Sequence, residues 1–440
     1  MAVPDQPAHP GQPATAAPWR QESAYGTDPV HRWADLAEFH AAPRRADGVH
    51  LVRSAHGGPY ELFTQGDPFE QQDGPVLVIF SGAVTGRERR QPPFLSGRSL
   101  APGLGLPLVA VSDPALSLAA DLGIAWYAGS EHQQVQSATE DLLRPLAQRL
   151  RGELWLVGGS AGGFAALETG HRLGSSCSVF VWNPQTDLTE YFPRFVRHYG
   201  QAAFPAAAAS LRGSQWKARL AEAMAAAGCR SDLASGPPEG EAPRRLLYLQ
   251  SADDDLHVRS HAAPYLESQG YRRLEPGLWT DGAQRVAWFA ETGEGHTPPS
   301  GDRIHAILER LTRPSRETML ERVAQMDAEP FFDRSRPWTR PDDLRPVRDD
   351  VAGLVSWRVR GRRVSGSLRM LPPDYARMRW RADVLDGKDR VLQSAPDLPM
   401  PSTWDLAPEP SMRRVRVSLI DGMGHLLVRR HLTVNASEVR

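Results

Sequence analysis

Short apolar runs separated by helical patterns dominate residues 49–312. A hairpin pattern at 49–64 is followed by six apolar runs, at 76–80, 107–111, 154–157, 179–182, 246–250 and 286–289. Leucines at helical spacing fill the interval 136–150, and a helical pattern at 302–311 ends the series. Fully apolar strands joined by helices are typical of a mostly parallel sheet covered by helices on both faces.

The pattern changes to a period of two after residue 346. Apolar and polar residues alternate at 355–359, 364–368, 377–384, 415–420 and 426–429, and the turn Asp421-Gly-Met-Gly-His425 separates the last two segments. This alternation predicts a small antiparallel β-sandwich of the immunoglobulin-like kind over residues 347–440.

The remaining boundaries follow from composition. We expect a disordered leader at residues 1–30, an α/β domain at 31–312 and a linker rich in Arg, Pro and Asp at 313–346. Residues 183–244 leave the strand–helix rhythm and carry Ala-rich and aromatic helical segments. An insertion of this size between two core strands predicts a helical cap over an active site.

The charge of the 440-residue chain is nearly balanced, with 51 basic and 52 acidic residues. No overall field therefore attracts nucleic acid or an anionic membrane, and neither partner is expected. No window approaches the ~18 consecutive apolar residues of a membrane span, and the N-terminus lacks the apolar stretch of a secretory signal. The only cysteines, Cys177 and Cys229, indicate no disulfide framework, so we expect a cytoplasmic protein.

The segment Gly158-Gly159-Ser160-Ala161-Gly162 matches the pattern G-x-S-x-G. An apolar strand precedes it and a helical pattern follows, which is the context of a nucleophile elbow. Ser160 is therefore the candidate nucleophile, and the backbone N–H of Ala161 is a candidate oxyanion donor. The alternative is a glycine-rich turn of a nucleotide-binding fold, but no G-x-G-x-x-G pattern or Walker lysine accompanies it. No cofactor is expected.

A serine nucleophile needs a histidine base and a carboxylate that orients it. His296 follows the last predicted strand of the α/β domain and is the candidate base. Three consecutive aspartates, residues 253–255, follow the strand at 246–250. We favour Asp255 as the orienting residue because it precedes Val258 in a D-x-x-V arrangement, with Asp254 a close second.

Two histidines near these aspartates, His257 and His261, are spaced like paired metal ligands. No third ligand of suitable spacing accompanies them, so no metal is expected.

A second oxyanion donor is expected in the loop after the strand at 76–80. Gly82 allows close approach of the backbone, and the N–H of either Gly82 or Ala83 is a candidate donor. The alternative, His56-Gly57-Gly58, is similar to an esterase oxyanion motif but lies before that strand, and we treat it as a decoy.

The loop after Gly82 and one later aromatic pair are candidates for substrate binding. Guanidinium groups recognise carboxylates and phosphates, although a solvated charged loop is as good an explanation. The residues are Arg87, Arg89, Arg90, Trp126 and Tyr127.

The elbow, the Asp-bearing turn and the late histidine resemble the α/β-hydrolase superfamily over roughly residues 48–312. A hydrolase core with a β-sandwich also resembles bacterial proteins that modify surface glycans, including the O-acetyltransferase component of accessory secretion systems, through the triad positions alone. The resemblance implies a serine hydrolase that acts on a small-molecule or glycan carboxylic ester. The alternatives are an O-acyltransferase or deacetylase acting on a bacterial glycan, and a catalytically inactive scaffold whose sandwich binds a partner. The oligomeric state is left open.

Overall fold

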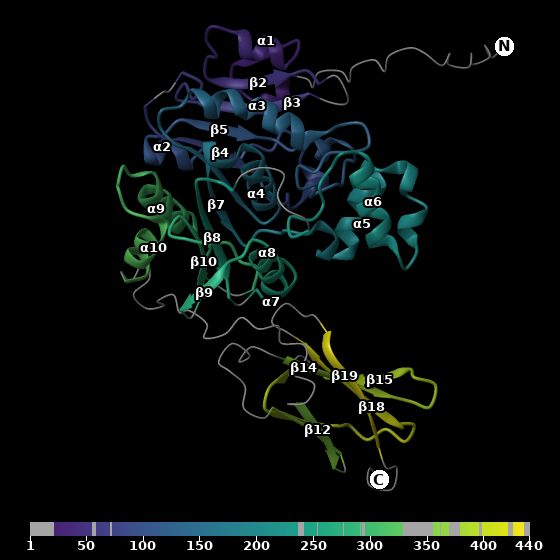
Figure 1. Cartoon of the computed structure of the whole chain (residues 1–440). Coiled ribbons are helices and arrows are strands. Elements are labelled where there is room, and N and C mark those ends of the chain that lie inside the picture. The colour runs from purple at the N-terminus through teal and green to yellow at the C-terminus, as the bar shows by residue number, and fades with distance from the viewer. Residues whose placement is uncertain are drawn as a thin grey trace, which may run out of the picture. The chain divides into compact units, whose positions relative to one another are not determined.

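The computed structural model describes residues 22–434 except 55–58, 71–72, 236–241, 253, 276, 291, 293–294, 329–354, 361, 369–378, 396–397 and 421–425. Contacts divide the chain into two compact units, and Figure 1 labels the elements of both. The first unit holds the described residues of 1–181, 187–233 and 237–245, and the second holds those of 182–186, 234–236 and 246–440. The predicted decoy motif at 56–58 and the turn at 421–425 lie outside the described residues.

The main sheet has eleven strands in the order β1-β2-β3-β5-β4-β6-β7-β8-β11-β10-β9. Parallel pairs include β4 with β5, β4 with β6, and β8 with β11, whereas β3 runs antiparallel to β2 and β5. The strands are β1 (Val30–Trp33), β2 (Gly48–Val52), β3 (Tyr60–Gln65), β4 (Val76–Phe80), β5 (Leu108–Val111), β6 (Leu154–Gly159), β7 (Ser178–Trp182), β8 (Arg245–Ser251), β9 (Arg272–Glu275), β10 (Leu278–Thr280) and β11 (Arg285–Ala290).

The central strands form where the sequence has its continuous apolar runs. Every residue of β4, β5 and β6 is buried, which is why these segments show no alternation. The six predicted strands correspond to β4, β5, β6, β7, β8 and β11, and the predicted hairpin corresponds to β2 and β3. The predicted mostly parallel sheet with connecting helices is confirmed.

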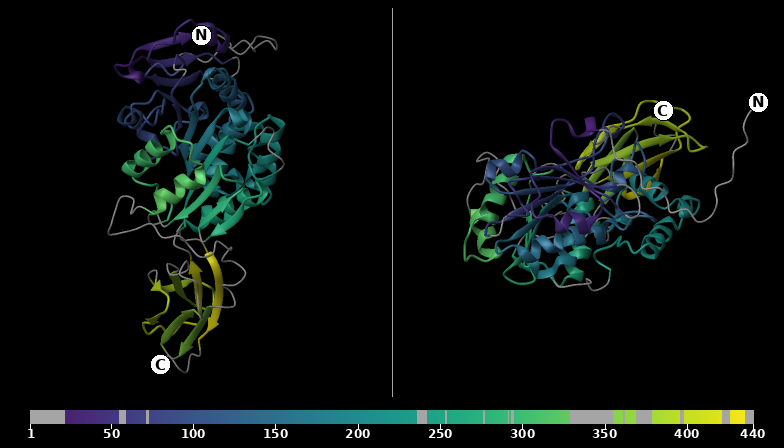
Figure 2. Two further views of the ribbon diagram at one scale, coloured as in Figure 1. Left: turned by 60° about the vertical axis from the view of Figure 1, so that its left-hand side comes forward. Right: turned by 90° about the horizontal axis from the view of Figure 1, so that it is seen from above.

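Helices connect these strands, and the two views of Figure 2 show them beside the sheet. Helix α4 packs against β6, β4 and α3, and α3 buries the leucines that predicted it. Among the described residues, no helix has the length and apolarity that a membrane span requires. The helices are α1 (Leu36–Ala41), α2 (Leu100–Leu104), α3 (Val135–Arg149), α4 (Ala161–Leu173), α5 (Pro193–Ala203), α6 (Trp216–Ala226), α7 (Asp255–His257), α8 (Ala263–Ser268), α9 (Gly301–Thr312) and α10 (Met319–Ala328).

The insertion between β7 and β8 is helical, as predicted. It contains α5 and α6 together with 3-10 turns at Leu188–Glu190, Pro205–Ala207 and Ser210–Arg212. The amphipathic α5 buries Val196 and Tyr199 on one face. The position of this segment over an active site stays a prediction.

The C-terminal segment forms two antiparallel sheets around one core. One sheet has the order β12-β13-β17, and in the other β15, β14, β18 and β19 follow one another while β16 also pairs with β14. Trp357 and Val364 from the first sheet share a buried cluster with Trp380 and Val417 from the second, so the predicted sandwich is confirmed. Its strands are β12 (Val355–Arg360), β13 (Arg363–Leu368), β14 (Arg379–Leu385), β15 (Val391–Ser394), β16 (Leu398–Pro399), β17 (Ser402–Asp405), β18 (Arg414–Ile420) and β19 (Leu426–Thr433).

Two boundary predictions are wrong in part. The end of the predicted leader is folded, because Tyr25 is buried, its hydroxyl donates to Glu61 Oε1 at 2.8 Å, and β1 pairs with β2. The predicted linker begins with an ordered helix: α10 buries Met319, Val323 and Met326 and contacts α9 and β11. The Arg- and Pro-rich composition of residues 313–346 concealed this apolar helical face.

Helix α10 is fastened to the end of α9 by the buried side chain of Arg322. Its Nη1 donates to the carbonyls of Arg310 at 2.5 Å and Leu311 at 2.6 Å, and its Nη2 donates to the carbonyl of Arg313 at 3.2 Å. These carbonyls belong to the last turn of α9 and its C-cap, where no intrahelical donor remains. One guanidinium therefore caps α9 and anchors α10.

We expect Arg322→Met to lower the free energy of unfolding by about 2 kcal/mol, because charge-assisted hydrogen bonds to buried carbonyls are lost. Urea unfolding of the full chain followed by tryptophan fluorescence measures the change. Arg316→Met, at an exposed position of the same segment, should stay within about 0.5 kcal/mol of the wild type. Equal effects of the two substitutions would show that the cap contributes nothing specific.

Candidate active site

Ser160 occupies the turn between β6 and α4. Its backbone has φ 55° and ψ −119°, a conformation that residues with a side chain adopt only under strain. The preceding strand is buried throughout, and α4 begins at the next residue, Ala161. This is the backbone geometry that the predicted nucleophile elbow requires.

Glycines make this turn sterically feasible. A Cβ atom on Gly158 would overlap the carbonyl of Gly162, and a Cβ on Gly162 would overlap the carbonyl of Phe80 at the end of β4. The start of α4 therefore lies directly against the end of β4. Any side chain at either glycine would push the helix away from the strand.

The loop that follows β4 lies beside the Ser160 turn. A Cβ on Gly82 would be 3.3 Å from the carbonyl of Gly159. Two backbone N–H groups of this loop are already bonded, since Ser81 donates to Tyr127 Oη at 2.8 Å and Val84 donates to the Gly123 carbonyl at 2.8 Å. Within the described part of the chain, no hydrogen-bond acceptor is found for the N–H groups between them, those of the predicted donors Gly82 and Ala83.

Tyr127 supports this loop from the protein interior. Its side chain is buried, and its hydroxyl donates to the Val111 carbonyl at 2.7 Å while it accepts from Ser81. Its own N–H donates to the buried carboxylate of Asp113 at 2.7 Å. Burial raises the pKa of Asp113 to about 7, and hydrogen bonds from Tyr127 and Ala115 oppose that rise. Tyr127, predicted to bind substrate, is thus a structural residue.

In the second unit, Asp254, the second choice for the orienting aspartate, contacts His296. This contact favours Asp254, and the role of Asp255 stays a prediction. Asp254 Oδ2 lies 2.5 Å from His296 Nδ1. Asp254 immediately precedes α7, and its Oδ1 also accepts from the N–H of His257 at 3.3 Å, as a helix-capping residue does. Asp255 is the first residue of the helix.

The loop of His296 is tied to the end of β8 by Asn183, which directly follows β7. The buried Asn183 side chain accepts from the N–H of Ser251 at 2.7 Å and donates to the carbonyl of Thr297 at 3.3 Å. One amide therefore holds the segments that carry Asp254 and His296. Sequence analysis did not identify Asn183, which has no motif of its own.

His257 is a second histidine on the Asp254 carboxylate. Its Nδ1 lies 2.9 Å from Asp254, and its ring stacks on that of His296 with centroids 4.0 Å apart and planes at 15°. On the other side, its Nε2 lies 2.8 Å from Gln185 Nε2. Asp254 and His257 are fully buried, whereas the His296 side chain is 24% exposed. Sequence analysis noted His257 only as one of two histidines with ligand-like spacing.

These three side chains are also the group in the described residues with atoms suited to a metal. Ligand-type atoms of Asp254, His257 and His296 all lie within 4.8 Å of one another. However, the two imidazole rings are nearly parallel, so the in-plane lone pairs of their nitrogens run side by side instead of converging on one point. The arrangement fits two donors on one carboxylate better than a coordination sphere.

Arg87 and Trp126, both predicted to bind substrate, are core residues. The Arg87 guanidinium is buried and donates to the carbonyls of Leu122 at 3.1 Å and Leu116 at 2.9 Å. Trp126 is buried, with Tyr199 edge-on at 5.6 Å. Arg87 also lines the cavity beside Ala83 that is described below. Binding of substrate by Arg87 and Trp126 therefore stays a prediction, although burial could not be read from residue type.

The other two arginines of the loop, Arg89 and Arg90, are exposed. Arg90 lies over the ring of Phe94 at 5.3 Å. Binding of substrate by these two arginines stays a prediction.

A cavity of about 350 Å³ opens beside Ala83. Its wall is largely apolar, with aliphatic groups from the loops after β4 and β5 and two aromatic rings from the start of the helical insertion. The side chains include Val84, Leu122, Ile124, Tyr191 and Phe195, with His198 and Asp121 forming a 3.2 Å ion pair. Cavities of this size and character accommodate small organic groups.

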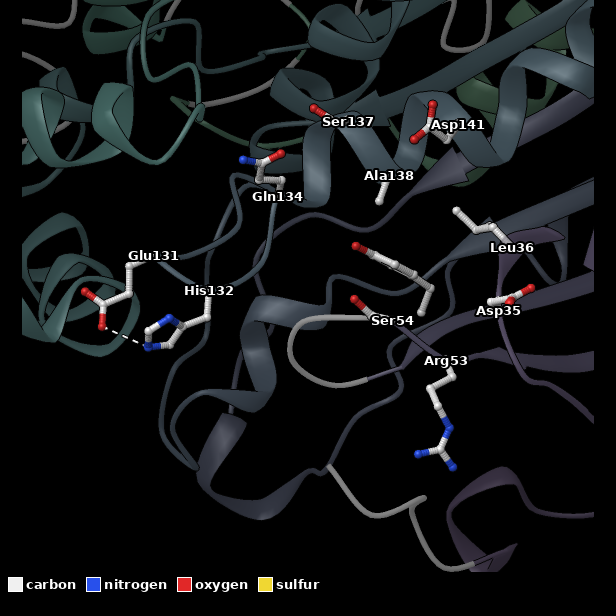
Figure 3. A pocket seen from close by; sticks show the side chains of 11 residues that line it. Asp35, Leu36, Arg53, Ser54, Glu131, His132, Gln134, Ser137, Ala138 and Asp141 are labelled. Carbon is white, nitrogen blue, oxygen red and sulfur yellow. Dashed lines mark ion pairs between the residues drawn. The ribbon is translucent and has the colours of Figure 1, made fainter. Parts of the chain in front are cut away.

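A larger cavity of about 630 Å³ lies at the start of α3 and is shown in Figure 3. Its lining is polar, with Asp35 and Asp141, the guanidinium of Arg53, and Glu131 paired to His132 at 3.1 Å. The site residues predicted from the sequence are not among the described residues that line it.

Comparison with known proteins gives distant structural likenesses only. No protein-family model matches the sequence, and no curated protein matches it. Among solved structures, the capsule O-acetyltransferase of Neisseria meningitidis serogroup A is similar at 10% identity, covering 58% of this chain and 94% of that one, with a TM-score of 0.37. The fluorophosphonate-binding serine hydrolase F of Staphylococcus aureus is similar at 11% identity, covering 58% and 92%, with a TM-score of 0.32. An S-formylglutathione hydrolase from Agrobacterium tumefaciens is similar at 15% identity, covering 60% and 91%, with a TM-score of 0.34. Likeness at this level assigns no activity or substrate to this chain.

Proposed function

We propose that this protein is a serine hydrolase that cleaves a carboxylic ester through an acyl-enzyme on Ser160. The observation that carries the proposal is the strained backbone of Ser160, at φ 55°, between a buried strand and the first turn of α4. Strain of this kind persists only where the surrounding packing enforces it, and it clusters at reactive sites. Here the glycines at 158 and 162 keep strand and helix together around the serine.

In this proposal His296 Nε2 takes the proton of the Ser160 hydroxyl, and Asp254 orients the imidazole. The bond from Nδ1 to Asp254 leaves Nε2 as the basic nitrogen. Burial alone would raise the pKa of Asp254, but its interactions with His257 and His296 outweigh burial and hold that pKa well below its usual range. The carboxylate is therefore ionised, as stabilising an imidazolium requires. Strands of one sheet present Ser160 after β6, Asp254 after β8 and His296 after β11, which is the chain order of α/β-hydrolases.

The oxyanion of the tetrahedral intermediate needs N–H donors that no other group occupies. We assign this role to the N–H of Ala161, at the first position of α4, together with that of Gly82 or Ala83. The partial positive charge at a helix N-terminus favours an anion there. Because Tyr127 binds Ser81 and Gly123 binds Val84, the two donors in the loop between them are held in place before substrate arrives.

The cavity beside Ala83 suits the acyl group of the ester. Its apolar wall and volume of about 350 Å³ fit a short or medium aliphatic or a small aromatic acyl chain. Transfer of the acyl group to a hydroxyl instead of water would use the same serine, base and cavity. The triad is therefore the same whether the acyl group passes to water or to a glycan hydroxyl. Identifying the reaction product distinguishes the two reactions.

A fluorophosphonate probe should label Ser160 in the folded protein, because it reacts with serines that an adjacent base activates. Peptide mapping by mass spectrometry locates the adduct. Ser160→Ala should abolish labelling and ester hydrolysis, whereas Ser176→Ala, at an exposed position, should leave both unchanged. Absence of labelling at Ser160 would favour the inactive scaffold over both enzymes. Sugars with free hydroxyls supplied as acceptors, beside a nitrophenyl ester as the acyl donor, distinguish hydrolysis from acyl transfer.

We expect Asp254→Asn to lower kcat by about 10⁴-fold, since an amide cannot stabilise the imidazolium and favours the wrong tautomer. Asp255→Asn, one residue along the chain, should keep kcat within about tenfold of the wild type. Steady-state hydrolysis of a nitrophenyl ester by both variants gives the comparison. A larger loss in Asp255→Asn would reassign the orienting residue to Asp255.

A large side chain in the cavity beside Ala83 should exclude long acyl chains from the site while short ones still bind. Val84→Trp is expected to lower kcat/KM for nitrophenyl hexanoate by about tenfold or more, since each methylene excluded from an apolar site costs about 0.8 kcal/mol. Hydrolysis of the acetate should change much less, and Gln91→Ala, at an exposed position of the same loop, serves as a control. If the acetate and the hexanoate lose activity equally, the cavity does not bind the acyl chain.

A further inference from the structure

The carboxylate of Asp254 has two imidazole partners, although the proposed reaction uses only one. His296 Nδ1 lies 2.5 Å from it and His257 Nδ1 lies 2.9 Å from it, and the two rings are stacked face to face. We propose that His257 is a positioning residue of the site: it shares the Asp254 carboxylate with His296 and thereby sets how much negative charge reaches the base. This inference rests on the proposed function for its catalytic meaning.

The hydrogen bonds around His257 define its protonation. Gln185 has an amide nitrogen 2.8 Å from His257 Nε2, and an amide N–H can only donate, so Nε2 must be the unprotonated acceptor. The ring proton then lies on Nδ1 and is donated to Asp254. The chain of bonds runs from Gln185 to His257 to Asp254, with a neutral imidazole and an ionised carboxylate. Every donor in it meets an acceptor.

The neutral imidazole of His257, by donating a hydrogen bond to Asp254, weakens the attraction of the carboxylate for the second imidazole, that of His296. A hydrogen bond to an ionised acceptor withdraws charge from it. With His257 in place, Asp254 stabilises the imidazolium form of His296 less than an unshared carboxylate would. Activity that depends on His296 as a base should therefore extend to lower pH than it would with an unshared carboxylate. The stacked ring of His257 also fixes the plane of His296, since the planes differ by only 15°.

Few other charged groups face this pair among the described residues. On β8, Tyr248 is buried near Asp254, and its pKa is raised well above the usual value by burial first and then by Tyr265 and Asp254. After His257, His261 lies with its ring centroid 4.9 Å away and its Nδ1 3.3 Å from the N–H of Thr186. On α9, Arg303 donates to the carbonyl of Thr292 at 3.3 Å. In the described contacts, Tyr248, His261 and Arg303 donate no hydrogen bond to Asp254. His257 is therefore the residue whose substitution tests the proposal.

Two substitutions should move the acid limb of the kcat/KM profile in opposite directions. His257→Phe keeps a ring but removes the donor, so Asp254 holds the imidazolium form of His296 more strongly, and the acid limb should move to higher pH. Gln185→Glu offers an acceptor to Nε2 and stabilises a positive charge on His257, so the acid limb should move to lower pH. His257→Asn retains an N–H donor and should titrate close to the wild type. Histidine-labelled NMR of the full chain follows His296 directly, and the acid limb of kcat/KM should shift by the same amount in each variant.

The controls separate this role from a structural one. His132→Phe removes an exposed histidine and should leave the titration unchanged. If His257→Phe does not fold, Gln185→Glu still tests the proposal, because this variant leaves the stacked ring of His257 in place. The proposal is overturned if folded His257→Phe titrates like the wild type, or if both variants shift in the same direction. A shift that EDTA reverses would also overturn it, in favour of a metal site. The proposed function fails separately: if Ser160 is not labelled while His296 titrates as expected, the carboxylate is shared but the serine is not activated.

Discussion

Close contact between the first turn of α4 and the end of β4 is the constraint on which the proposed active site depends. Helix and strand touch through the backbone because Gly162 has no side chain to separate them, and the missing side chain of Gly158 in β6 lets α4 approach that strand as well. Ser160 is strained within this contact, and a Cβ on Gly82 would lie 3.3 Å from the carbonyl of Gly159. The nucleophile and the proposed oxyanion donors are thus placed by one packing interaction instead of by separate loops.

The sequence predicted the parts of the fold whose signal is local. Continuous apolar runs located the central strands to within a residue or two, since burial on both faces removes any alternation. Strands at the edges were missed: every residue of β9 is exposed, and β1 is a short segment with two polar residues. Helix α10 was missed for another reason, because Arg- and Pro-rich flanks hid an apolar face that forms only against α9 and β11.

The sequence predicted those site residues whose position depends on the order of strands along the chain. It did not predict those whose position depends on local backbone geometry. Ser160 and His296 follow from their positions after particular strands. The choice between Asp254 and Asp255 depends on where α7 begins, and a run of three aspartates contains no information on that. Likewise an arginine in a loop looks exposed in sequence, yet Arg87 is buried, and its guanidinium bonds the carbonyls of Leu116 and Leu122 in the connection after β5. Asn183 and His257 act through contacts more than 60 residues apart in the chain, 68 and 72 respectively, which no motif records.

The second histidine also answers a physical problem that the triad alone leaves unsolved. A fully buried carboxylate is costly unless its oxygens are hydrogen-bonded. The His296 imidazole satisfies one oxygen, and the other would otherwise have only the long 3.3 Å bond from the backbone N–H of His257. If solvent supplied the other partner, Asp254 would have to be exposed, and the dielectric around the pair would rise. His257 supplies the partner without opening the site, and Gln185 keeps that partner neutral. Burial of the orienting carboxylate and moderation of its effect on His296 are therefore consequences of the same two hydrogen bonds.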